Sequence, residues 1–103
     1  MDDFTRVTEH AFCYTYERLI PAGETRILKM RRPSPNKRGV NDIGFACDDG
    51  ITLYATLSEK PESANAIWQE IQSFDEINKT TSYIKIKNSG STAARVNIRV
   101  IMN

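Results

Sequence analysis

Apolar and polar residues alternate with strict period two near the end of this chain, and this pattern most constrains its fold. In residues 83–87 isoleucine alternates with tyrosine and lysine, and in residues 94–100 alanine, valine and isoleucine alternate with arginine and asparagine. Successive side chains of a β-strand point to opposite faces of a sheet, so each segment has one buried and one solvated face. The polar stretch "NSGST" between them predicts a turn. The sequence therefore predicts a closing β-hairpin.

Earlier segments carry the same kind of pattern, at 11–20, 25–30, 42–47 and 51–57. Asp48-Asp49-Gly50 lies between the last two of these segments and predicts a second hairpin. Short strands separated by turn residues are typical of an antiparallel β-sandwich, either jelly-roll or immunoglobulin-like. We expect an all-β fold of six to eight strands.

Residues 66–77, "AIWQEIQSFDEI", fit two structures. Ile67, Ile71, Phe74 and Ile77 are spaced as on one face of a helix, but Trp68 does not fit that stripe. A strand followed by a turn fits about as well. The all-β context favours the strand, with one short helix near residues 66–77 kept as the alternative.

The predicted core joins the inward positions of both hairpins. Its members are Ile84, Ile86, Val96, Ile98 and Val100 with Ile43, Phe45, Ile51 and Leu53. The 103 residues correspond to one domain. We place that domain at residues 11–103 and interpret the polar residues 1–10 as a loosely held N-terminal arm.

The composition is that of an ordinary globular protein with no dominant charge. The net charge is +1, so electrostatic recognition has to be local. No apolar run has the length of a membrane span, and the acidic N-terminus does not resemble an export signal. We therefore expect a protein made in a cytoplasm, without a membrane partner, in which Cys13 and Cys47 are reduced and buried.

No pattern in the sequence indicates catalysis, and we expect a protein that is not an enzyme and needs no metal or other cofactor. The single histidine, His10, lies in the polar arm and cannot supply a catalytic triad alone. Two cysteines and one histidine are too few for a four-ligand zinc site. Asp48 and Asp49 are too few for calcium, and a turn explains them.

A basic loop and the N-terminal arm are the candidate interaction sites. The cations of the loop are Arg31, Arg32, Lys37 and Arg38, and the candidate apolar contacts of the arm are Phe4 and Val7. We expect these residues to contact neighbouring subunits. Deleting residues 1–9 should then weaken assembly and leave the fold intact.

Two other features suggest different ligands. Trp68 is expected in the core, but if it were exposed beside Tyr54 or Tyr14 it would suit a carbohydrate. A nucleic acid could stack a base on Tyr83 and place its phosphates near Lys85 and Lys87, although a single tyrosine is a small stacking surface.

The "IPAGET" turn and the final "YIKIKNSGSTAARVNIRVI" segment resemble the small β-sandwich structural proteins of tailed-bacteriophage virions. The resemblance covers about residues 12–102 and contains no diagnostic motif. It implies a non-enzymatic capsid decoration, head-fibre, collar or tail component that assembles with itself and with other virion proteins in the host cytoplasm. The alternative is a carbohydrate-binding or other ligand-binding module, and a small nucleic-acid binder is the least favoured.

Overall fold

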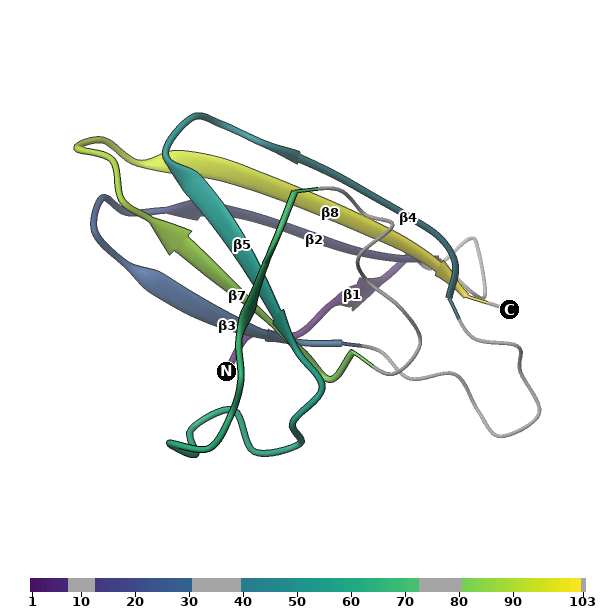
Figure 1. Cartoon of the computed structure of the whole chain (residues 1–103). Coiled ribbons are helices and arrows are strands. Elements are labelled where there is room, and N and C mark those ends of the chain that lie inside the picture. The colour runs from purple at the N-terminus through teal and green to yellow at the C-terminus, as the bar shows by residue number, and fades with distance from the viewer. Residues whose placement is uncertain (8–12, 31–39, 73–80, 103) are drawn as a thin grey trace.

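The fold of the chain is all-β. A computed structural model describes residues 1–7, 13–30, 40–72 and 81–102, and these contain eight strands and no helix (Figure 1). The strands are β1 (Thr5–Arg6), β2 (Cys13–Ile20), β3 (Thr25–Lys29), β4 (Val40–Cys47), β5 (Ile51–Thr56), β6 (Gln69–Ile71), β7 (Tyr83–Asn88) and β8 (Ala94–Met102). The predicted antiparallel β-sandwich is confirmed.

The strands form two sheets of four, in the orders β1-β2-β8-β4 and β3-β7-β5-β6. Their pairing is nested, because β2 pairs with β8, β3 with β7, and β5 with β6. A long antiparallel ribbon wrapped around itself produces this order, which is the jelly-roll connectivity. An immunoglobulin sandwich instead keeps several consecutive strand pairs within one sheet.

The two predicted hairpins are wrong, although their strands are correct. β4 and β5 lie in different sheets, and so do β7 and β8, so the turns at 48–50 and 89–93 cross from one sheet to the other. Turn residues set the local backbone direction, but they do not decide whether the flanking strands pair. β8 instead lies between β2 and β4 in the middle of its sheet.

The ambiguous segment contains a strand. β6 pairs with β5 at the edge of its sheet, which confirms the favoured prediction for its first half. Residues 73–77 lie outside the described part of the chain.

The core is built from alternate residues of both sheets. The predicted members Ile84, Ile86, Val96, Ile98 and Val100 are fully buried, and Leu53 is nearly so. Phe45 and Ile51 are half-buried against this cluster. The side chain of Ile43 lies outside the description.

The N-terminal residues 1–7 are part of the sandwich, which corrects the expectation of a loosely held arm. The amide of Asp2 donates to the carbonyl oxygen of Ile27 at 2.9 Å, and Thr5–Arg6 pair with β2 in the other sheet. Between these contacts Phe4 enters the core and is only 4% exposed. The segment therefore joins the edges of both sheets. Residues 8–10 lie outside the description.

The turns that connect the sheets gather at one end of the sandwich (Figure 1). Asn88, the last residue of β7, lies at this end and is 1% exposed. Its Nδ2 donates to the carbonyl oxygens of Ile20 and Thr92, each at 2.9 Å, and its Oδ1 accepts from the amide of Gly90 at 2.9 Å. Gly50 approaches so closely that a Cβ there would lie 3.2 Å from Oδ1 of Asn88. The side chain of Asn88 thus links two turns by hydrogen bonds, and the third turn packs closely against it.

Candidate interaction surfaces

The predicted interaction residues do not form one surface in the described part of the chain. Arg31, Arg32, Lys37 and Arg38 lie outside it. Phe4 is buried in the core, so it cannot offer a contact to a neighbour while the domain is folded. Val7 is half-buried, and its amide donates to the carbonyl oxygen of Cys13 at 2.9 Å.

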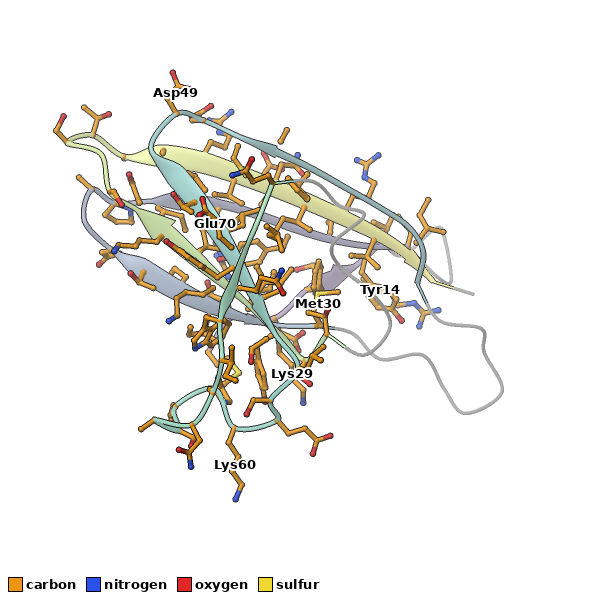
Figure 2. All side chains as sticks on the ribbon, viewed as in Figure 1. Tyr14, Lys29, Met30, Asp49, Lys60 and Glu70 are labelled. Carbon is orange, nitrogen blue, oxygen red and sulfur yellow. The ribbon has the colours of Figure 1, made fainter. Side chains whose placement is uncertain are left out.

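The β5–β6 loop, residues 57–68, is the largest described connection, and short-range hydrogen bonds shape it. The amide of Ser63 donates to the carbonyl oxygen of Lys60 at 3.1 Å, and the amide of Ala66 donates to that of Ser63 at 3.1 Å. Polar side chains add to this, because the amide of Lys60 donates to Oγ of Ser58 at 3.1 Å. Figure 2 shows Lys60 on this loop, at the end of β5 opposite to the turn that contains Asp49. The loop is therefore a shaped projection of the sandwich.

Two large aliphatic side chains are exposed at the base of this loop. Ile67 is 82% exposed and Leu57 is 63% exposed. Both line a groove of about 400 Å³, which Ala55 and Ile71 continue toward the core. Single exposed apolar residues are common on protein surfaces, but two beside one groove form a small apolar patch.

Sequence reasoning missed this groove for an identifiable reason. In the sequence, Leu57 continues the period-two pattern of inward residues in 51–57, and Ile67 belongs to the apolar stripe of a possible helix. Both patterns predict burial. β5 ends at Thr56, so Leu57 falls one residue beyond the strand. The sequence did contain a signal, because Leu57 and Ile67 flank the polar, proline-containing stretch 58–65 within two residues.

The outer face of the β3-β7-β5-β6 sheet carries a second group of side chains. Tyr54 on β5 is paired with Glu70 on β6 and with Lys85 on β7. Trp68 is half-buried, and Nζ of Lys85 lies 4.4 Å from the centroid of its ring. Trp68 is therefore on the outer face of the sheet, and the prediction that it lies in the core is wrong.

Among the residues that the structure describes, two titratable groups have shifted pKa values. Burial, followed by the hydrogen bond that its hydroxyl donates to Oδ2 of Asp2, raises the pKa of Tyr16 well above its usual value. Tyr16 thus remains neutral and ties the N-terminal segment to β2. Partial burial of the thiol, followed by the Asp48 carboxylate, raises the pKa of Cys47. A raised pKa disfavours the nucleophilic thiolate.

Both cysteines are free thiols, but neither is fully buried as expected. Cys13 is half-buried, and Cys47 is exposed as a residue although its thiol is partly shielded from water. Cys13 pairs with Ile101 and Cys47 with Val96, at separated positions along β8. Five residues of strand span roughly 17 Å, well beyond the reach of a disulfide.

Within residues 1–7, 13–30, 40–72 and 81–102, His, Cys, Asp and Glu do not gather in groups that could hold a metal ion. No helix of the described chain could cross a membrane.

Comparison with known proteins adds no relative. No protein-family model, no curated protein and no solved structure matches the chain.

Proposed function

We propose that this protein is a non-enzymatic structural component of a tailed-phage virion that acts by assembling with itself and with other virion proteins. The observation that carries the assembly role is the pair of exposed side chains, Leu57 and Ile67, beside one groove on the shaped β5–β6 loop. Water solvates this apolar surface in the monomer, and a neighbouring subunit would remove it from water.

The free energy gained by burying these two side chains suits assembly in a large particle. Burying a leucine or isoleucine side chain stabilises a contact by about 1.5–3 kcal/mol. Two such side chains do not by themselves offset the cost of association. Repetition of the contact around a closed oligomer adds the same contribution at each interface.

The proposal that the protein belongs to a virion rests on its fold and its resemblance, and not on the groove. The jelly roll is an architecture of viral capsid proteins, and it also occurs in lectins and enzymes, so fold alone does not select the function. The resemblance of residues 12–102 to small virion proteins is what favours a decoration, head-fibre, collar or tail position.

The assembly role can be tested with single serine substitutions. Leu57→Ser and Ile67→Ser should lower the mass in sedimentation equilibrium from that of an oligomer toward that of the monomer, because each removes apolar area from the contact. Leu19→Ser is the matched control, since Leu19 is 61% exposed on β2 of the other sheet. All three variants should melt cooperatively near the temperature of the parent.

The virion assignment has its own test, which is mass spectrometry of purified particles from a host that carries the gene. We expect the chain among the particle proteins. A parent chain that is monomeric at all concentrations and missing from those particles would contradict the proposed function.

A further inference from the structure

We propose that the outer face of the β3-β7-β5-β6 sheet binds one sugar residue of a neutral polysaccharide through Glu70, Tyr54 and Lys85. We call these three residues the saccharide row. Its side chains do not line the groove beside Leu57 and Ile67. The inference therefore does not depend on the assembly role.

The register of three strands brings the row together. Tyr54 is the direct partner of Glu70 on one side and of Lys85 on the other. Side chains at directly paired positions have Cβ atoms about 4.5–5.5 Å apart. Leu53 and Ile86, the sequence neighbours of Tyr54 and Lys85, are buried in the core, so the row itself faces outward.

The chemistry of the row matches that of a sugar ring. The C–H face of a pyranose is apolar and flat, and the phenol ring of Tyr54 offers it an apolar surface. Hydroxyl groups around the pyranose are both donors and acceptors. Glu70 can only accept hydrogen bonds when ionised and Lys85 can only donate them, so together they complement hydroxyl groups, which do both.

Trp68 positions Lys85 within the row. Nζ of Lys85 lies 4.4 Å from the centroid of the Trp68 ring, which is within cation–π range. This contact restricts a flexible side chain before a ligand arrives, which reduces the entropy lost on binding. Trp68 is thus a positioning residue, and one face of its ring is occupied by the ammonium group.

The surface beyond Lys85 extends the row. Ile27 on β3 is the partner of Lys85 on the side away from Tyr54. Ile27 also lines a groove of about 230 Å³, together with Thr25 and the loop residues Pro61 and Glu62. A chain of linked sugars lying across the strands would therefore meet the row first and then this groove.

The charges favour a neutral saccharide over a nucleic acid. Lys29 and Lys87 are exposed on the same sheet, but the acidic residue Glu70 is the direct cross-strand partner of Tyr54. A phosphodiester chain that stacked on Tyr54 would pass this carboxylate and be repelled by it. The whole chain carries a net charge of only +1.

Trp68 supplies the readout, because it is the single tryptophan of the chain and contacts the row. The parent protein is first applied to an array of purified neutral O-antigen and capsular polysaccharides, with single-stranded oligo(dT) as the nucleic-acid probe. The polysaccharide that gives the strongest array signal is then titrated while Trp68 fluorescence is recorded. We expect saturable binding of a polysaccharide and none of oligo(dT).

Substitutions in the row then test the site. Tyr54→Ala and Glu70→Gln should each weaken binding by about tenfold or more, which corresponds to about 1.4 kcal/mol. Tyr54→Phe should bind within about threefold of the parent, because it keeps the ring. Arg99→Ala, on the exposed face of the other sheet, should bind like the parent.

Three outcomes would overturn the saccharide site. One is that no polysaccharide of the array binds the parent. Another is that Glu70→Gln and a cooperatively melting Tyr54→Ala both bind as tightly as the parent. The third is preferential binding of oligo(dT) that weakens steeply with salt, which would indicate a nucleic-acid surface instead.

Discussion

At the scale of single residues, Asn88 connects parts of the chain that are distant in sequence. Its side chain joins the carbonyl oxygen of Ile20 to the β7–β8 turn, and its backbone amide donates to the carbonyl oxygen of Glu24 at 3.0 Å. Asn88 occupies the next inward position after Ile84 and Ile86. An amide there satisfies backbone groups that an apolar residue would leave without partners.

Asn88→Ala should therefore lower the free energy of unfolding by about 2–4 kcal/mol, since buried carbonyl and amide groups lose their partners. The measurement is urea denaturation followed by circular dichroism. Ser89→Ala is the control, because Ser89 is the exposed next residue, and it should unfold within about 0.5 kcal/mol of the parent. Equal denaturation midpoints for both variants would show that the linked turns do not stabilise the domain.

At the scale of elements, the N-terminal segment 1–7 acts as a strap between the two sheets. It bridges β3 through Asp2 and then pairs with β2, so it protects one edge of each sheet from pairing with another chain. The ring of Phe4 packs edge-on against Tyr16, with the centroids 6.4 Å apart. The segment is therefore held by packing as well as by backbone hydrogen bonds.

Phe4→Ala should cost about 3–5 kcal/mol of unfolding free energy, the range found for emptying a buried aromatic site. Arg6→Ala, an exposed change in the same segment, should have little effect. Chemical denaturation of both variants tests this difference. If Phe4→Ala unfolds at the same denaturant concentration as Arg6→Ala, the strap does not contribute to the core. Because of Phe4, we also expect deletion of residues 1–9 to destabilise the fold and not only to weaken assembly.

The strands show what the sequence can and cannot specify. Period-two alternation identified the inward residues of β7 and β8 correctly, because that pattern depends only on local backbone geometry. The turn sequences "DDG" and "NSGST" led to the wrong strand pairing, because each connects two strands that lie in different sheets. Which side chains of neighbouring strands lie next to one another also depends on strand pairing. No local signal could therefore place Glu70 and Lys85 on either side of Tyr54.

At the scale of the whole molecule, nested pairing joins the two halves of the chain. β8 pairs along its length with β2 on one side and with β4 on the other. The sheet cannot form until its last strand in sequence is available, so contacts between distant residues dominate the fold. Such topologies fold slowly, on the scale of milliseconds to seconds.

The position of β8 leads to a prediction for one inward residue. Ile98 is fully buried between its cross-strand partners Tyr16 and Phe45. Ile98→Asp would bury an unpaired carboxylate in the middle of the sandwich, so it should lower the free energy of unfolding by about 4 kcal/mol or more. That loss is comparable to the roughly 5–15 kcal/mol that stabilises a typical domain. The thermal transition should become broad or disappear in calorimetry.

Arg99→Asp is the matched control for this change, because it introduces the same carboxylate one residue further along β8, on the exposed outer face. It should retain a cooperative transition close to that of the parent, since the new charge remains solvated. If Ile98→Asp melts like Arg99→Asp, the interior of β8 does not hold the sheets together. Loss of the transition in Ile98→Asp alone would show that the two halves of the chain depend on this strand for a common core.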